Sequence, residues 1–158
     1  MNVRVARISD AEAVHTLSGE LAAVVGDEPS PEENIRARLG ELLEGQNSGV
    51  LVAVVGGEVV GVVSYWIKAD LAHGDSVAEI PMLAVSPKHR RGGVGRALLA
   101  AVSDLAADAG ALLIELVTTP TNVAARQFYR SLGFVETDHV VLEFVGGVED
   151  LSEVIEEA

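Results

Sequence analysis

The sequence predicts a single mixed α/β (α+β) domain, on three observations. The chain has 158 residues, which suits one domain with a proper core. Hydrophobic residues make up 49% of it, which is typical of ordered globular structure. β-rich runs and amphipathic helical patterns follow one another without an internal repeat or a linker. Residues 1–145 are expected to form one domain, and residues 146–158, with five acidic residues and no basic one, an acidic tail that is a frayed helix or disordered.

The first half of the chain carries clear start and turn signals. The sequence Ser-Asp-Ala-Glu at residues 9–12 fits a capping box at the start of a helix. A second helix start follows at Ser30-Pro31, with proline at the first helical position. The pair Gly56-Gly57 separates two β-rich runs and predicts a hairpin. In order, we expect a strand over 3–8, a helix ending near Gly26, a helix ending at Gly45, and paired strands over 49–55 and 58–67.

The second half alternates strands and helices. Gly110 and Gly133 each follow a helical pattern and precede a β-rich run, which is the position of a glycine that ends a helix. In order, we expect a polar connection over 70–75, a strand over 77–85, a helix over 94–109, a strand over 111–118, a helix over 123–132 and a final strand or strand pair over 134–144.

The charge of the chain restricts its partners. There are 24 Asp and Glu against 11 Lys and Arg, and the formal net charge is −13. A nucleic-acid partner is not expected, because phosphate backbones need a broad basic surface. The acidity fits a cationic or amine substrate, and it fits simple solubility as readily.

Other protein classes are also disfavoured. No apolar run reaches the roughly 18 residues that a membrane helix needs, and the first residues lack the apolar core of a secretory signal, so no membrane partner is expected. The chain has no cysteine, which excludes a disulfide framework and a cysteine nucleophile and favours the cytoplasm. Its four histidines show no ligand spacing, so no metal is expected.

The most informative stretch is a basic, glycine-rich turn between an apolar strand and a long helix, at residues 85–96. Four of the 11 Lys and Arg of the chain fall within it, at Lys88, Arg90, Arg91 and Arg96. Glycines let backbone N–H groups approach a ligand closely. A helix N-terminus adds unpaired N–H donors and the positive end of the helix dipole. The turn therefore predicts a phosphate site and a phosphate-bearing cofactor.

Two nucleotide-binding motifs do not fit this turn. A P-loop needs Gly-Lys-Ser or Gly-Lys-Thr, which the chain lacks, and a Rossmann fingerprint needs a third glycine after Gly93-Val94-Gly95. What remains is Arg90-x-x-Gly93-x-Gly95, and 27 residues after Gly95 comes Asn122-x-x-Ala125-x-x-Phe128-Tyr129. This linked pair resembles the two central motifs of the GNAT superfamily of N-acetyltransferases. The order of the expected helices and strands over residues 3–144 also resembles that of this superfamily.

The resemblance implies the acyl-CoA N-acyltransferase fold of that superfamily, a mixed, twisted central sheet with splayed strands flanked by helices. It also implies acetyl-CoA as the cosubstrate, with main-chain N–H groups of residues 91–96 at the pyrophosphate and a bulged strand at the pantetheine arm. The residues that match the family's cofactor-binding positions are Leu83, Ala84, Val85, Arg90, Arg91, Gly92, Gly93, Val94, Gly95, Arg96, Asn122, Ala125 and Tyr129. Two alternatives stay open: the basic side chains are only solvated, and Asn122 only caps the helix that follows it.

Two residues are candidates for the chemistry. The resemblance implies that Tyr129 lies near the thioester sulfur, where its hydroxyl can protonate the leaving thiolate. It also implies that Glu79, six residues before Val85, is the general base that takes the amine proton. The alternatives are that Tyr129 packs in the core and that Glu79 is an exposed strand-end acid or pairs with an arginine.

The function predicted is transfer of an acetyl group to a primary amine of a small molecule, by direct attack in a ternary complex. The absence of cysteine excludes a cysteinyl-acyl intermediate. Acetylation of protein lysines or N-termini and a non-catalytic CoA-binding module are the alternatives, and a toxin that acetylates charged tRNA is disfavoured by the net charge. His73, Asp70 and Asp75 share one loop and are open as substrate contacts. A homodimer is expected, because dimers are common in the family.

Overall fold

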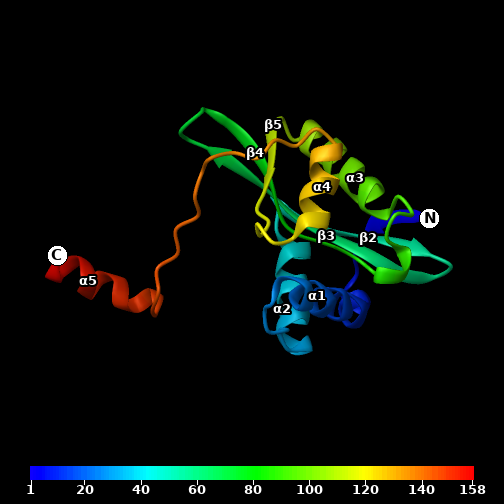
Figure 1. Ribbon diagram of the computed structural model, residues 1–158, viewed down its shortest axis with the longest axis horizontal. Coiled ribbons are helices and arrows are strands. Elements are labelled where there is room, and N and C mark those ends of the chain that lie inside the picture. Colours follow the sequence, from blue (N-terminus) through cyan, green and yellow to red (C-terminus); the bar gives the residue numbers. More distant parts are fainter. The chain divides into compact units, whose positions relative to one another are not determined.

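The computed structural model describes residues 1–158, and the chain forms two compact units, residues 1–123 and 124–158 (Figure 1). The first unit holds β1 (Asn2–Val5), α1 (Ala11–Val25), α2 (Glu32–Glu44), β2 (Ser48–Val55), β3 (Glu58–Asp70), β4 (Asp75–Val85), α3 (Val94–Asp108) and β5 (Ala111–Leu116). The helices α4 (Val123–Ser131) and α5 (Leu151–Glu157) complete the chain. The division into a domain over 1–145 and a tail stays a prediction.

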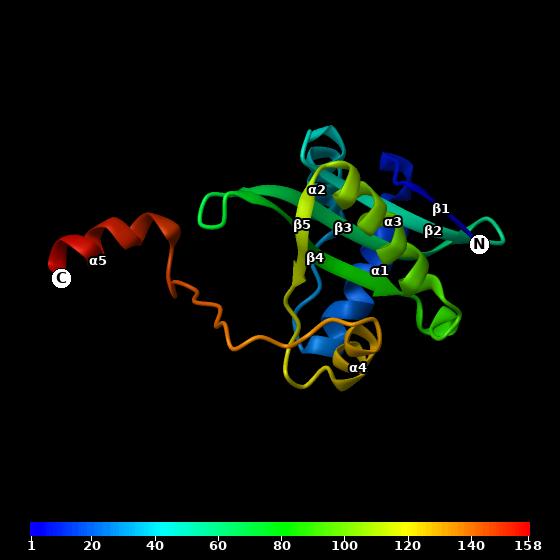
Figure 2. The same cartoon turned by 90° about the horizontal axis from the view of Figure 1, so that it is seen from above.

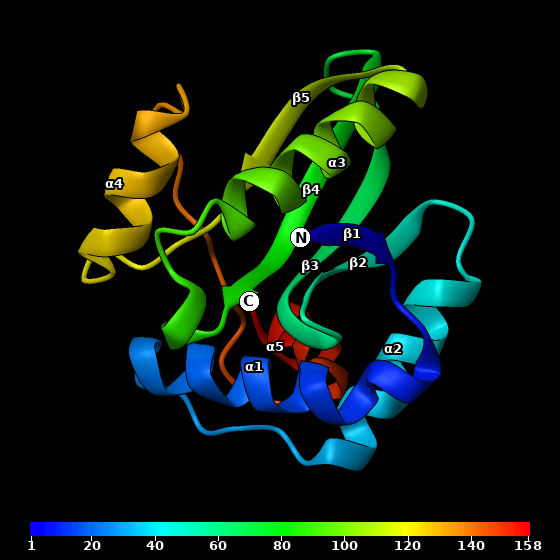
Figure 3. The same cartoon turned by 90° about the vertical axis from the view of Figure 1, so that its right-hand side faces the viewer.

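The first unit is built on one mixed five-stranded sheet in the order β1-β2-β3-β4-β5. Neighbouring strands are antiparallel except β4 and β5, which are parallel. α1 and α2 cover one face of this sheet and α3 covers the other (Figure 3). The expected α/β (α+β) fold class with a mixed sheet flanked by helices is thus confirmed.

Hydrophobic side chains fill both interfaces between the sheet and its helices. Adjacent strand residues point to opposite faces, so β3 serves both layers. Val62 packs with the core under α1 and α2, and Gly61 lies against Val94 and Leu98 of α3. The largest fully buried side chains are Leu98, Val52, Val62, Val63 and Val102. None of the helices combines the length and the apolar character needed to cross a membrane.

The predicted hairpin is confirmed as β2 and β3. Gly56 and Gly57 have φ of 58° and 84°, the left-handed conformation that two-residue turns of this kind require. Beyond the turn, the register sets Val55 opposite Glu58 and runs to Ser48 opposite Trp66. β3 and β4 then form a second, longer hairpin, whose turn lies within the expected polar connection over 70–75 (Figure 2).

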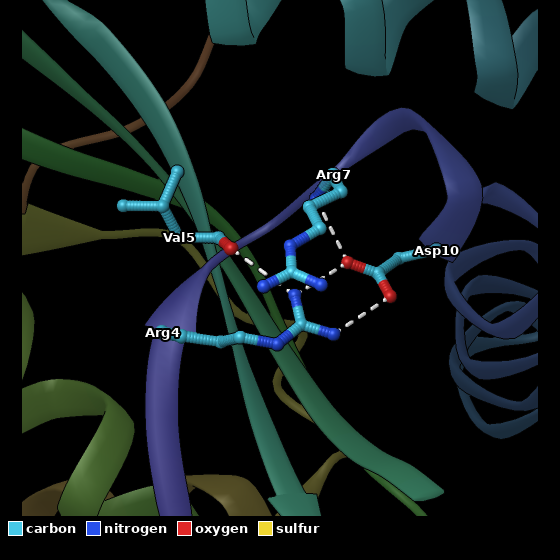
Figure 4. A network of polar contacts seen from close by, with 4 residues as sticks. All are labelled: Arg4, Val5, Arg7 and Asp10. Atoms are coloured by element: carbon cyan, nitrogen blue, oxygen red, sulfur yellow. Dashed lines mark hydrogen bonds and ion pairs between the residues drawn. The ribbon is translucent and has the colours of Figure 1, made fainter.

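The predicted capping box at residues 9–12 is wrong, because Ser9 lies inside a short 3-10 turn over Ile8–Asp10, and Asp10 takes its place as the residue that precedes α1. Asp10 precedes α1 without a side-chain cap there, and its Oδ2 instead accepts the backbone N–H of Arg7 at 2.8 Å. Both carboxylate oxygens also accept bonds from the Arg4 guanidinium, at 2.8 and 3.0 Å (Figure 4). These contacts join β1 to the start of α1, and they hold the pKa of Asp10 below its ordinary range, chiefly through the hydrogen bond from Arg4.

The predicted final strand over 134–144 is also wrong. The residues from 135 to 147 lie in no helix or strand. Their β-forming side chains include Val140, Val141 and Leu142, which are exposed. A strand needs a neighbouring chain segment to satisfy its backbone groups, and the β propensity of its residues does not supply one. The predicted acidic tail contains a short helix, α5.

Candidate functional site

The basic turn lies between β4 and α3 in the first unit. A short 3-10 turn over Pro87–His89 follows the strand, and Gly93 precedes the first residue of α3. Arg91 has a φ of 64° and is the one non-glycine residue of the chain in the left-handed region, and Gly93 follows with a φ of 83°. Residues other than glycine rarely adopt a left-handed conformation, and those that do cluster at binding sites. Left-handed residues within a turn, as at Arg91 and Gly93, are a feature of the backbone of anion-binding nests of N–H groups.

The main-chain N–H groups of this turn are available to a ligand. None of those from Arg91 to Arg96 donates a well-aligned hydrogen bond to a protein carbonyl, and the first bond into α3 runs from Ala97 N–H to the Gly93 carbonyl. The 15-residue helix α3 adds the positive end of its dipole at this point. The arrangement matches a phosphate-binding helix start.

The basic side chains of the turn have no acidic partners. Lys88, Arg90, Arg91 and Arg96 are all exposed, and none of them takes part in an ion pair, although the chain carries 24 acidic residues. Arg90 Nε lies 3.4 Å from the Val85 carbonyl, where β4 ends. The Nδ1 atom of His89 is buried in the same turn without a hydrogen-bond partner. This local positive surface favours an anion.

Gly61 on β3 sets the position of the turn against the sheet. A Cβ at this residue would lie 2.7 Å from Val94 Cγ1 and 3.0 Å from Leu98 Cδ1, closer than side chains tolerate. The absence of a side chain therefore lets the first turns of α3 pack onto β3. Gly61 was not predicted as a site residue from the sequence, although a glycine inside a strand pattern is a known sign of a close backbone approach.

The strand β4 leaves part of one edge unpaired next to this turn. Its ladder with β5 covers Ser76–Ile80 and ends where Ile80 faces Leu116, whereas β4 continues to Val85. Its register with β3 is irregular between Ser64 and Trp66, where β4 has one residue more than β3. Leu83, Ala84 and Val85 thus pair with β3 alone. This is the splayed, bulged strand that the resemblance implied.

Glu79 lies on the paired half of β4, between Trp66 of β3 and Glu115 of β5. Its Oε2 accepts a hydrogen bond from Lys68 Nζ at 2.5 Å, and about a third of its side chain is exposed. The ion pair corresponds to the alternative reading of Glu79, with a lysine in place of an arginine. Lys68 is a residue that the sequence analysis missed, because pairing across β3 and β4 depends on their register. The role of Glu79 as base stays a prediction.

The hairpin turn between β3 and β4 holds the three loop candidates. His73 Nδ1 and Asp70 Oδ2 form an ion pair at 2.5 Å, and Asp75 faces Asp70 across the strands. The contact with Asp70 raises the pKa of His73 and lowers that of Asp70. No group of three or more His, Cys, Asp or Glu side chains in the chain is arranged to hold a metal ion.

Tyr129 lies on α4 in a cluster of aromatic rings. Its ring centroid is 5.3 Å from that of Phe128 and 5.5 Å from that of Phe134. Burial raises the pKa of the Tyr129 hydroxyl to about 12, so the group stays protonated at neutral pH. Ala125 lies on the same helix, and Asn122 immediately precedes it, with its N–H donated to the Thr119 carbonyl. The packed ring and a functional hydroxyl are compatible, because the two roles use different parts of the side chain.

Together, the mixed sheet, the unpaired end of β4 and the N–H-rich turn define an α/β protein of the type that binds a phosphate-bearing cofactor beside a splayed strand. The sequence profile described as Acetyltransferase (GNAT) family matches residues 12–134. The chain therefore belongs to the GNAT acetyltransferase family, and the predicted family and enzyme class are confirmed at that level.

Individual relatives agree with this assignment. The chain is 32% identical over 110 residues to N-acetyltransferase 8 of Rattus norvegicus, covering 70% of this chain and 50% of that protein, so it spans half the length of this relative. It is 31% identical over 135 residues to the aminoalkylphosphonate N-acetyltransferase of Salmonella typhimurium, covering 85% of each. A solved structure of the aminoglycoside N-acetyltransferase AAC(6')-Iy in complex with CoA has the same fold, with a TM-score of 0.78 and 23% identity over 90% of this chain and 93% of that one.

Proposed function

We propose that this chain is an acetyl-CoA-dependent N-acetyltransferase that acetylates a primary amine of a small molecule. The observation that carries the proposal is the turn at residues 91–96, whose N–H groups donate no well-aligned hydrogen bond to a protein carbonyl. Membership of the GNAT family and the unpaired end of β4 support the same reading.

The residues of this chain fit the cosubstrate. The N–H groups of Arg91–Arg96, with the unpaired cations of the turn, would hold the pyrophosphate. The free edge of β4 at Leu83–Val85 would hold the pantetheine arm through main-chain hydrogen bonds, which need an edge without a partner strand. Asn122 and Ala125 are the further contacts that we propose at the start of α4.

The proposed chemistry uses one acid and one base. When bound, acetyl-CoA supplies the acetyl group as a thioester, and the substrate amine forms the new C–N bond as the C–S bond breaks. Tyr129, whose hydroxyl is protonated at neutral pH, donates a proton to the leaving sulfur. Glu79 accepts the proton that the amine nitrogen loses, directly or through water. Its Oε2 is engaged by Lys68, which leaves Oε1 for this contact.

The acceptor that we propose is a small amine. Two of the proteins that resemble this chain act, by their names, on aminoalkylphosphonates and aminoglycosides, which are small amines. The net charge of −13 favours an acceptor that carries positive charge. A cytoplasmic location and a homodimer stay predictions.

The test is thiol release from acetyl-CoA across a panel of small amines, with calorimetry of acetyl-CoA binding in parallel. Turnover with at least one small amine is expected. Binding without turnover on any amine identifies a non-catalytic module, and acetylated proteins without small-molecule turnover identify a protein acetyltransferase. Either result contradicts the proposal.

A second measurement tests the proton donor. Tyr129→Phe removes the hydroxyl and keeps the ring packed, so kcat should fall about 10²-fold with little change in acetyl-CoA affinity. The chain has one other tyrosine, Tyr65, and Tyr65→Phe is the matched control that should keep its kcat. Equal kcat in the two variants removes Tyr129 from the mechanism.

A further inference from the structure

One of the two lysines of the chain lies against the proposed base. Lys68 Nζ is 2.5 Å from Glu79 Oε2, in a contact that crosses from β3 to β4. Trp66 faces Glu79 directly across the strands, and Lys68, two residues further along β3, points to the same face of the sheet. About half of the Lys68 side chain is exposed, so a ligand can reach its nitrogen.

The position of Glu79 on β4 brings this lysine toward the proposed acetyl donor. With the pyrophosphate at residues 91–96, the pantetheine arm would run back along the free edge at Leu83–Val85, toward the paired half of the strand. The ladder with β5 ends at Ile80, one residue after Glu79. The thioester end of the arm would therefore approach the Glu79 carboxylate. All of these residues belong to the unit formed by residues 1–123.

We propose that Lys68 is a site of self-acetylation, an inference that rests on the proposed function. The proposed mechanism places an amine nitrogen beside the Glu79 carboxylate, and Lys68 Nζ already meets that condition. A nitrogen that the fold holds beside the base reacts without the entropy cost of bringing a free amine to the site. The transfer takes place within one chain, because the lysine and the base lie on neighbouring strands of the same sheet.

The step forms and breaks the same bonds as transfer to a free amine. The Lys68 ammonium passes one proton to the Glu79 carboxylate, and the electron pair of Nζ forms a C–N bond with the carbonyl carbon of the thioester. The C–S bond breaks, and the second proton that the nitrogen loses goes to the leaving thiolate, so the products are acetyl-lysine and CoA. The resulting amide carries no charge, which ends the ion pair with Glu79.

The chain contains an internal control, because its one other lysine is Lys88. Lys88 is exposed in the basic turn and forms no ion pair, so an uncatalysed reaction should modify it at least as readily as Lys68. The full chain is incubated with acetyl-CoA without an acceptor amine, and peptide mapping by mass spectrometry measures the acetylated fraction of each lysine. Acetylation of Lys68 is expected to exceed that of Lys88 about tenfold.

Two variants assign the reaction to the site. Glu79→Gln keeps Lys68 and removes the base, so acetylation of Lys68 should fall to the level of Lys88. Lys68→Arg combined with Arg38→Lys moves the lysine to α2, which packs against α1 and β2. There it can pair with Glu41, which Arg38 contacts at 2.9 Å. This displaced lysine should be acetylated no more than Lys88, because it has a carboxylate beside it but lies away from the proposed donor.

Acetic anhydride, applied without acetyl-CoA, measures the intrinsic reactivity of the two lysines. It should show no preference for Lys68. If it prefers Lys68 to the same degree as acetyl-CoA does, the site is not the cause and the inference is overturned.

Thiol release with the panel of small amines is measured on the same preparation. Turnover of a small amine without preferential acetylation of Lys68 overturns this inference and leaves the proposed function in place, with the contact to Glu79 as an ion pair only. Acetylated Lys68 without turnover of any amine supports self-acetylation and contradicts the small-molecule acceptor. The absence of both reactions overturns both proposals.

Discussion

The two halves of β4 differ in how their edges are used. Ser76–Ile80 is hydrogen-bonded to β3 on one side and β5 on the other, whereas the stretch from Met82 to Val85 pairs with β3 alone. An irregularity in the register separates the two halves. The paired half carries Glu79, and the half with a free edge leads into the basic turn.

Main-chain and side-chain groups are expected to act in different halves of β4. Buried main-chain N–H and carbonyl groups are almost always paired, so a strand paired on both sides offers a ligand only its side chains. A strand with one free edge also offers its main chain. We therefore expect substitutions in the paired half of β4 to change the rate and substitutions around the free half to change cosubstrate affinity.

The largest effect is expected for Glu79→Gln. If the carboxylate is the base, kcat should fall about 10²-fold, because the amide does not accept the amine proton. The dissociation constant of acetyl-CoA should stay unchanged, because Glu79 lies on the paired half. Glu115→Gln is the matched control, since Glu115 is the neighbour of Glu79 across the ladder, and it should retain full kcat. Kinetics and calorimetry on both variants check this, and parallel losses in both would remove the special role of Glu79.

Gly93→Asp should have the next largest effect, on affinity. The new carboxylate would lie among the N–H groups of the turn and repel the pyrophosphate, which should weaken acetyl-CoA binding by about 2 kcal/mol, or about thirtyfold. Gly110→Asp at the other end of α3 is the control. Gly93 and Gly110 have φ of 83° and 78°, and an added Cβ meets nothing within 4 Å at either. Calorimetry should therefore show weaker binding for Gly93→Asp alone, and equal losses would mean that backbone strain is the cause.

Gly61→Ala tests how the sheet positions the turn. The added Cβ would overlap Val94 and Leu98, so the free energy of unfolding should fall by about 2 kcal/mol, as for an overpacked core. Gly40→Ala in α2 is the control with the opposite sign. Its Cβ would lie 3.7 Å from Ile8, an ordinary contact, and alanine favours a helix by about 0.5–1 kcal/mol. Denaturant unfolding of both variants measures the difference, and a stable Gly61→Ala would show that α3 can move away from β3.

Local patterns predicted most of this fold. Gly56-Gly57 marks the β2–β3 turn, and the predicted helix over 94–109 agrees with α3 within a residue. These features depend on neighbours in sequence. The strand expected over 134–144 failed because its formation depends on an edge elsewhere, and the β propensity of Val140–Val145 carries no information about that edge.

The part of the candidate site that was predicted from the sequence is the part whose residues are neighbours along the chain. The glycines and cations of the turn lie in one short segment, so the sequence shows them together. Lys68 and Gly61 were missed because their contacts with Glu79 and with α3 are set by the register of β3 against β4 and by packing across the sheet. A sequence pattern gives the faces of a strand but not the residue that lies opposite.

The smallest effect is expected for Asp10→Asn. Asp10 lies outside β4, so this substitution should lower the stability of the fold without acting on either half of β4. The Asp10 carboxylate is 9% exposed and binds Arg4 and the Arg7 N–H, so its loss should cost about 1 kcal/mol in the free energy of unfolding near pH 7. The pKa of Asp10 is lowered in the folded state, so this contribution is present above the unfolded pKa of about 4 and is lost as the pH falls through the lower folded value. The stability gap between the unmodified chain and Asp10→Asn should therefore close in acid, whereas Asp27→Asn, at an exposed residue without an ion pair, should show little gap at any pH. Urea unfolding from pH 7 downward measures both, and a gap that stays constant with pH would mean that the Asp10 charge does not stabilise the fold.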